Sequence, residues 1–155
     1  MSDNTFTPSI FYRDPRAALE WLEKAFGFEL TMLIDSPNGD TRMIHSEMSV
    51  AGRGRIMIGG EWAEWARSPQ SVGGASTQSV HVHIETDVDA HCAHARSAGA
   101  VIVAEPATQF YGARTYRAQD PEGHVWTFAQ EVGELPAREE AERMIGAKIQ
   151  AKNWP

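Results

Sequence analysis

The feature that most constrains this fold is an internal repeat of one strand-helix-strand-strand-strand pattern. In each copy an aspartate precedes a helical stretch that ends at a glycine, Asp14 with Gly27 and Asp87 with Gly99, and the two aspartates lie 73 positions apart. Three strand-like runs follow each helix. Aspartate is a favoured N-cap residue and glycine a favoured residue just beyond a helix end. The repeat therefore predicts two copies of one βαβββ unit.

The repeat also predicts how the chain is divided. We expect a first module over residues 8–61, a connector over 62–78, a second module over 79–130 and a C-terminal helical extension over 131–155, all within one structural domain. One helix covers one face of each sheet and leaves the other face free. The expected fold class is α+β: two tandem βαβββ modules forming a curved mixed sheet, with a concave cleft and the helices outside.

Composition and charge exclude several classes of protein. The chain has 155 residues, 42% of them hydrophobic, with 21 acidic and 14 basic residues and a net charge of −7. An acidic chain argues against nucleic acid as a partner. No run approaches the roughly 18 apolar residues of a membrane span, and the first residues lack the basic and apolar parts of a secretory signal. We therefore expect a cytoplasmic protein with no membrane partner.

The hairpins of the two copies align with a different offset from the helices. Gly54 lies over Gly123, 69 positions further on. The same offset pairs His45 and Glu47 with Arg114 and Tyr116, and we expect these four side chains to meet in the cleft. His45 and Glu47 are then candidate catalytic residues, since imidazole and carboxylate serve as acids and bases near neutral pH. Arg114 and Tyr116 are candidate ligand-binding residues, and the alternative is a solvated strand face with cross-strand ion pairs.

Two tryptophans interrupt the polar connector. Trp62 and Trp65 are three residues apart and can share one face of a helical turn. They either line a ligand cavity or fill a hydrophobic seam between parts of the fold.

The motifs resemble those of one known superfamily. The doubled βαβββ order, with SIFYRDPRAALEWLEKAFGFE, VHIETDVDAHCAHARSAGA and YGARTYRAQDPEGHVWTF, is similar to the vicinal oxygen chelate superfamily, which includes glyoxalase I, bleomycin-resistance proteins and extradiol dioxygenases. The resemblance covers about residues 8 to 130. It implies paired modules around a cup-shaped cleft, a homodimer and, in many members, one divalent metal ion.

The metal positions that this resemblance implies carry unsuitable residues. Metal ligands of the superfamily lie seven residues before the helix-capping aspartate and four residues after the hairpin glycine, which here gives Thr7, Val80, Ile58 and Thr127. Divalent metals favour imidazole and carboxylate ligands. We therefore predict no metal and no other cofactor, and treat Thr127 as a ligand-binding position in the cleft.

Two histidines provide a fallback metal site. His81 and His83 lie two apart on one strand and so share a face, but they alternate with Val80 and are expected to face away from the cleft. The favoured interpretation is that they are hydrogen-bonded beside the helix, near His91 or His94. The alternative is a single divalent metal ion with His45 and Glu47 as further ligands.

Three functions remain open from the sequence. The leading hypothesis is a glyoxalase/bleomycin-resistance-like protein that binds a small molecule in its cleft without the usual metal. The alternatives are a metal-dependent lyase like glyoxalase I, or a dioxygenase, and a non-catalytic dimeric interaction module. The C-terminal extension is expected to form a helix with a narrow apolar stripe of Ala141, Met144, Ile145 and Ile149.

Overall fold

The strands form two mixed sheets of four strands each. The structure is a computed structural model and describes residues 4–154. The first module contains β1 (Ser9–Tyr12), α1 (Pro15–Phe26), β2 (Glu29–Ile34), β3 (His45–Val50) and β4 (Arg53–Gly60), with sheet order β1-β4-β3-β2. The second contains β5 (Ser79–His83), α2 (Val88–Ser97), β6 (Val101–Thr108), β7 (Ala113–Gln119) and β8 (Val125–Glu131), in the equivalent order β5-β8-β7-β6. The predicted α+β class and tandem βαβββ modules are confirmed.

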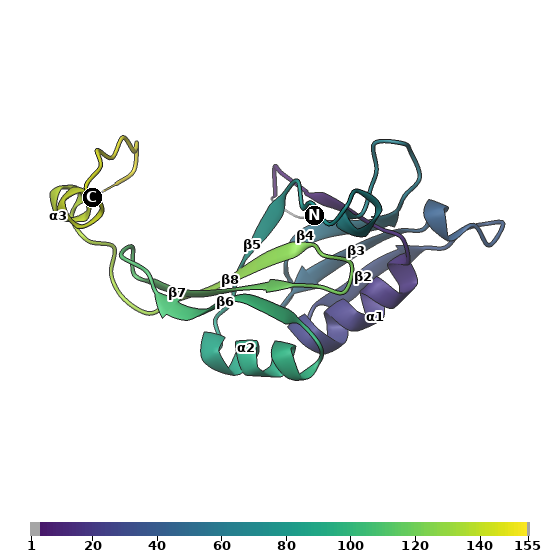
Figure 1. Ribbon diagram of the computed structural model, residues 1–155, viewed down its shortest axis with the longest axis horizontal. Coiled ribbons are helices and arrows are strands. Elements are labelled where there is room, and N and C mark those ends of the chain that lie inside the picture. The colour runs from purple at the N-terminus through teal and green to yellow at the C-terminus, as the bar shows by residue number, and fades with distance from the viewer. Residues whose placement is uncertain (1–3, 155) are drawn as a thin grey trace.

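Both helices begin and end as their sequences predict. The carboxylate of Asp14 accepts a hydrogen bond from the backbone N–H of Ala17, and that of Asp87 accepts from Asp89 and Ala90. Gly27 ends α1 at a φ of 72°, a left-handed conformation that glycine adopts without Cβ strain. Figure 1 shows α1 and α2 on the same side of the sheets. We call the sheet face toward these helices the inner face, and the opposite one the open face.

The chain is irregular before β3 and within β6. Residues 42–44 do not join β3, since Thr41–Met43 form a 3-10 turn capped by Asp40. Pro106 lies within β6, which is an edge strand and has register shifts between Ile102 and Ala107. A proline is tolerated there because an edge strand with bulges leaves some N–H groups without a ladder partner.

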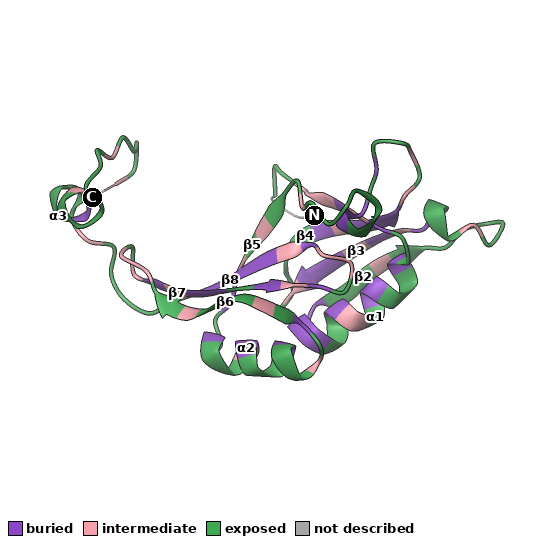
Figure 2. Ribbon diagram, in the orientation of Figure 1, coloured by how far each residue is buried: buried purple, intermediate pink, exposed green. Residues whose placement is uncertain are grey.

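A shared core joins the two modules. Phe26, at the end of α1, is 2% exposed, and its ring packs against Trp126 and Phe128 of β8, at centroid distances of 5.9 and 4.7 Å. Phe28 also contacts Trp126, at 5.2 Å. In Figure 2 the buried residues follow the inner sides of both helices and much of β8. The two modules therefore bury their inner faces together.

A buried carboxylate adds a polar connection between the modules. Asp120, in the turn before β8, is 4% exposed and accepts hydrogen bonds from Tyr12 Oη at 2.6 Å and Trp126 Nε1 at 3.0 Å. Its other oxygen accepts from the backbone N–H groups of Glu122 and His124. Burial, and then the nearby Asp120 carboxylate, raises the pKa of Tyr12 well above its ordinary value, so the hydroxyl remains a donor.

Histidines of α2 bind the carbonyl end of α1. His91 Nε2 donates to the carbonyl of Phe26 at 3.0 Å, and His94 Nε2 donates to that of Lys24 at 2.7 Å. His91 Nδ1 then accepts from Tyr116 Oη at 2.6 Å, which requires a neutral ring. These contacts satisfy carbonyls that the last turn of a helix leaves without partners.

The stability of the protein should fall on mild acidification because of His91. Burial lowers the pKa of His91, whereas the ring in the unfolded chain titrates near 6.5. The unfolded chain therefore binds the proton first, and stability is lost as the pH falls through about 6.5 toward the lower folded-state pKa. Urea unfolding between pH 7.5 and about 5 measures this slope. His91→Gln should flatten it, and His81→Gln, at an exposed position, should not; an unchanged slope in His91→Gln would contradict the assignment.

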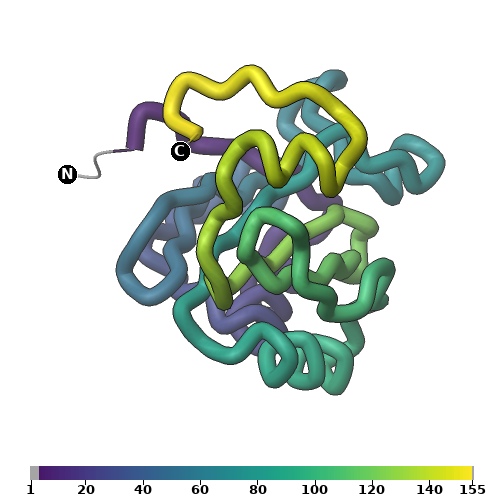
Figure 3. Tube along the Cα trace, turned by 90° about the vertical axis from the view of Figure 1, so that its left-hand side faces the viewer, coloured from purple at the N-terminus to yellow at the C-terminus, as the bar shows by residue number. Residues whose placement is uncertain are grey.

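The C-terminal extension forms an arm that projects from the second sheet. Helix α3 (Arg138–Ile145) ends at Gly146, which has a φ of 67°, so the helix is shorter than expected. It makes no contact with another helix or strand among the described residues, and Figures 1 and 3 show the following segment folding back beside it. Trp154 Nε1 donates to the carbonyl of Pro136 at 3.0 Å, and Ala141 is fully buried. Within residues 4–154, no helix is long and apolar enough to cross a bilayer.

Candidate functional site

A hollow between the two modules is the best-formed candidate site. This seam pocket has a volume of about 340 Å³ and lies between the β3–β4 hairpin of the first module and β5 of the second. Volumes of this order accommodate a small organic molecule. Its lining consists of Asn4, Phe6, Pro8, Phe28, Met48, Ser49, Val50, Arg53, Gly54, Arg55, Ile56, Val80, His81, Val82, His83 and Trp126.

Aromatic and aliphatic side chains form the apolar part of the seam pocket. Phe28 and Trp126 are both buried and pack edge to face. Val80 and Val82 lie on the inner face of β5, because they pair in register with Trp126 and Phe128 of β8. Since the strands alternate with period two, the same face of β5 that completes the shared core also lines the pocket.

Basic residues contribute to the lining of the seam pocket. Arg53 pairs with Glu85 at 3.0 Å. Arg55 lies 3.7 Å from the carboxylate of Glu47 and donates to Thr7 Oγ1 at 3.4 Å. His81 and His83 add two imidazoles from β5. None of the described residues that line the pocket is an aspartate or glutamate, so its polar groups are basic or neutral.

A buried hydroxyl in the seam pocket has no partner in the protein. Ser49 is 8% exposed, and its Oγ makes no hydrogen bond among the described residues. It lies where the register between β3 and β4 shifts, between Met48 and Val50. A buried polar group without a hydrogen bond costs about 1–3 kcal/mol. The hydroxyl therefore has an unused hydrogen-bonding capacity in a residue that lines the pocket.

His45 and Glu47 lie together, but without the expected partners. They pair with Gly59 and Met57 across β3 and β4 and share the open face. Glu47 is held by Arg55 from the neighbouring strand rather than by Arg114. The pair thus belongs to a strand surface of the first module.

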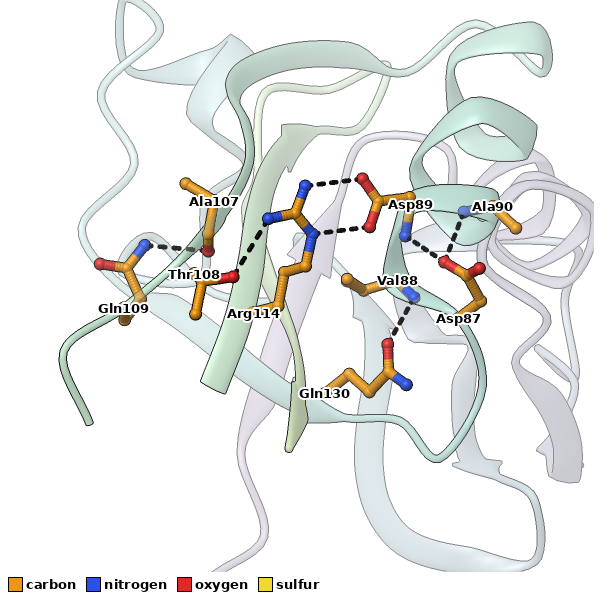
Figure 4. A network of polar contacts seen from close by, with 9 residues as sticks. All are labelled: Asp87, Val88, Asp89, Ala90, Ala107, Thr108, Gln109, Arg114 and Gln130. Atoms are coloured by element: carbon orange, nitrogen blue, oxygen red, sulfur yellow. Dashed lines mark hydrogen bonds and ion pairs between the residues drawn. The ribbon is translucent and has the colours of Figure 1, made fainter. Parts of the chain in front are cut away.

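Arg114 and Tyr116 are on the inner face, and their expected meeting with His45 and Glu47 is wrong. Arg114 binds Asp89 of α2 through two hydrogen bonds of 2.6 and 2.9 Å (Figure 4). The Arg114 hydrogen bond lowers the pKa of Asp89. Tyr116 is 1% exposed and is bonded to His91. Both side chains therefore connect β7 to α2.

The alignment of the two hairpins at an offset of 69 fails because the pairing of β3 with β4 shifts by one residue near their turn. In β4, Ile56 and Ile58 face the helix, whereas the positions that the offset assigns to them in β8, Val125 and Thr127, face the open side. The shifted register near the β3–β4 turn changes the alternation, and a shift of one residue moves every side chain to the other face.

His81 and His83 face the open side, contrary to expectation. They pair with Thr127 and Ala129, the open-face residues of β8, and neither is bonded to His91 or His94. Ser9, which pairs with Met57, lies five residues before Asp14, whereas the equivalent His81, which pairs with Thr127, lies six residues before Asp87, so β5 is displaced by one residue relative to the helix cap. Counting back from the capping aspartate therefore misassigned the face of β5.

Thr127 is on the open face but is not free to bind. It is 3% exposed, and its hydroxyl accepts a hydrogen bond from Arg117 Nε at 3.1 Å. Arg117 lies directly opposite Thr127 in the β7–β8 pair.

Trp62 and Trp65 are surface residues rather than a buried seam. Their side chains are 52% and 68% exposed, and their rings meet edge to face at 4.9 Å. Trp65 also packs against Phe11 of β1, at 5.7 Å. Together with Phe11 and His124, Trp65 lines a second hollow of about 300 Å³ beneath the connector.

The described residues do not fit a divalent metal. They contain no cluster of three or more His, Cys, Asp or Glu side chains able to hold one. Of the positions that the resemblance implies, Ile58 is fully buried and apolar. The hydroxyls of Thr7 and Thr127 already accept hydrogen bonds from arginines. His81 and His83 lack a third ligand within the described part of the chain.

Ser49, Arg53 and Arg55 did not stand out as candidates in the sequence. One signal was present: Arg53-Gly54-Arg55 places two cations in a tight hairpin of an otherwise acidic chain. Ser49 carried no signal, since its burial depends on the register shift beside it.

Comparison with known proteins agrees with this architecture. The family model described as the Glyoxalase/Bleomycin resistance protein/Dioxygenase superfamily matches residues 5–128. The uncharacterized protein Mb0911c of Mycobacterium bovis is 30% identical over 133 residues, which span 83% of this chain and 84% of that protein. TioX from Micromonospora sp. ML1 superposes with a TM-score of 0.63 at 29% identity, over 83% of this chain and 99% of TioX.

A more distant structure shows the fold alone. Glyoxalase I from Zea mays has a TM-score of 0.62 at 16% identity, over 84% of this chain and 44% of the maize chain. The tandem βαβββ modules and the family match over residues 5–128 together identify the chain: it belongs to the Glyoxalase/Bleomycin resistance protein/Dioxygenase superfamily.

Proposed function

We propose that this protein binds a small, largely apolar molecule in the seam pocket. The observation that carries the proposal is an apolar hollow, with Phe28 and Trp126 in its lining, that also contains the unpartnered hydroxyl of Ser49. Apolar pockets with a few polar groups are typical small-molecule sites. Val80 and Val82 complete the apolar lining from the second module.

Calorimetric titration with 2-naphthoate, 2-naphthamide and 2-naphthylmethylamine tests the proposal, since these share one ring system and are respectively anionic, neutral and cationic at neutral pH. At least one should bind, and Val82→Phe should weaken that binding by more than about tenfold, or 1.4 kcal/mol, because the added ring occupies the pocket. Val103→Phe is the matched control, at an exposed position of β6 outside the pocket. Failure of all three compounds to bind, or equal binding to Val82→Phe, would refute the proposal.

We further propose that the protein is a homodimer in which the arm of one chain packs on the other. The arm exposes Leu135, Met144 and Ile145, and α3 has only eight residues. A helix this short is marginal in water without tertiary packing. These exposed apolar side chains support the proposal that a second copy of the chain provides the surface on which α3 packs.

Removal of the arm should therefore change the oligomeric state. A chain ending at Glu131 should have the mass of a monomer in size-exclusion chromatography with light scattering, and the full chain that of a dimer. Met144→Glu with Ile145→Glu should have the same effect, and Arg143→Glu should not. A dimer that persists without the arm would contradict this role.

A further inference from the structure

We infer that the ligand of the seam pocket is an organic anion, with an apolar body and a carboxylate or similar oxyanion at one end. This inference rests on the proposed function and names its ligand class. The bound anion would have its oxyanion at Ser49, Arg53 and Arg55, and its apolar body against Phe28, Val82 and Trp126.

The charges around the seam pocket support an anion. The protein has a net charge of −7, yet the pocket is lined by two arginines and two histidines, with no acidic residue among its described lining. An arginine fork matches the two oxygens of a carboxylate, and such charge-assisted hydrogen bonds are stronger than neutral ones. An organic cation would meet the two arginines in the lining, whereas their carboxylate partners Glu47 and Glu85 are not part of it.

The ion pairs of these arginines leave donor groups for a ligand. Arg55 approaches Glu47 through Nη1 at 3.7 Å, longer than a direct hydrogen bond, and its other terminal nitrogen meets Thr7 at 3.4 Å. Arg53 and Glu85 have side chains 66% and 78% exposed, so their pair is weak. A carboxylate in the pocket can therefore compete for both guanidinium groups.

The hydroxyl of Ser49 provides an independent indication. It is buried, lines the same pocket and has no partner among the described residues. A serine hydroxyl can donate one hydrogen bond to an oxyanion. It could equally serve a neutral polar group, so the arginines decide the charge of the ligand.

Titration of 2-naphthoate against 2-naphthamide separates anion recognition from shape recognition. The carboxylate should bind at least about tenfold more tightly than the amide, and its affinity should fall as salt increases. Arg53→Gln with Arg55→Gln should remove most of this difference, while binding of the amide stays unchanged. Ser49→Ala should weaken naphthoate binding without removing a charge, and Arg114→Gln, at an arginine paired outside the pocket, should have no effect.

The outcomes distinguish the two proposals. Equal binding of naphthoate and naphthamide, both weakened by Val82→Phe, would overturn the anion assignment and leave small-molecule binding intact. Tighter binding of the cation 2-naphthylmethylamine would overturn it in the same way. No binding of any of the three would overturn the proposed function as well. Melting temperatures of the arginine variants verify that each is folded; they are expected near that of the wild type because the Arg53–Glu85 pair is exposed and the Arg55–Glu47 contact is long, at 3.7 Å.

Discussion

Replacing Asp120 with alanine should lower the free energy of unfolding by about 3–5 kcal/mol, because it leaves several buried donors without an acceptor. The donors are the Tyr12 hydroxyl, the Trp126 indole and the backbone N–H groups of Glu122 and His124. Hydrogen bonds to charged groups contribute about 1.5–3 kcal/mol each and are not additive. Urea unfolding measures the loss.

Matched variants separate the parts of this network. Tyr12→Phe removes one donor and should cost about 1–2 kcal/mol. Asp89→Ala removes an aspartate of a surface pair with Arg114 and should cost much less than Asp120→Ala. A loss in Asp120→Ala no larger than that in Asp89→Ala would show that the buried carboxylate does not stabilise the junction between the modules.

Replacing Phe26 with alanine should cost about 3–5 kcal/mol, the range for removing a buried phenylalanine. Its ring lies between α1 and β8 and contacts Trp21, Phe28, His91, Trp126 and Phe128. The resulting cavity would lie at the boundary of the two modules, so both should lose stability together. Urea denaturation monitored by both circular dichroism and tryptophan fluorescence checks whether the two modules unfold in one transition.

Two further variants serve as controls for Phe26→Ala. Phe26→Leu retains much of the volume and should cost less than the alanine variant. Phe6→Ala, at a residue 87% exposed, should change the free energy of unfolding by less than about 0.5 kcal/mol. Separate transitions for the two modules in the wild type, or a negligible effect of Phe26→Ala, would contradict a shared core.

Local chemistry made much of the fold predictable. Asp14, Asp87 and Gly27 are helix-end signals that act within a few residues, and the structure places them as predicted. The repeated order of elements then determined the modules, because each helix can cover only one face of its sheet. The position of Pro106 within β6 was not predictable, because a strand tolerates proline only at the edge of a sheet, and the local sequence does not contain the sheet order.

The site was less predictable because it depends on register. A change of one residue between β5 and α2 reversed the face of His81 and His83, and the shift near Val50 separated His45 and Glu47 from Arg114 and Tyr116. The seam pocket also combines residues of two modules, such as Ser49 and Val82. Their proximity results from packing of the inner faces, which no local pattern encodes.

The most direct test of a ligand site in the seam between the modules is a crystal structure of the protein soaked with 2-naphthoate. The account predicts naphthalene density against Phe28 and Trp126, with the carboxylate within hydrogen-bond distance of Ser49 Oγ and of Arg53 or Arg55. Crystals of Val82→Phe should show none there. Naphthoate bound only on the open face beside His45, with the seam pocket empty, would contradict the account.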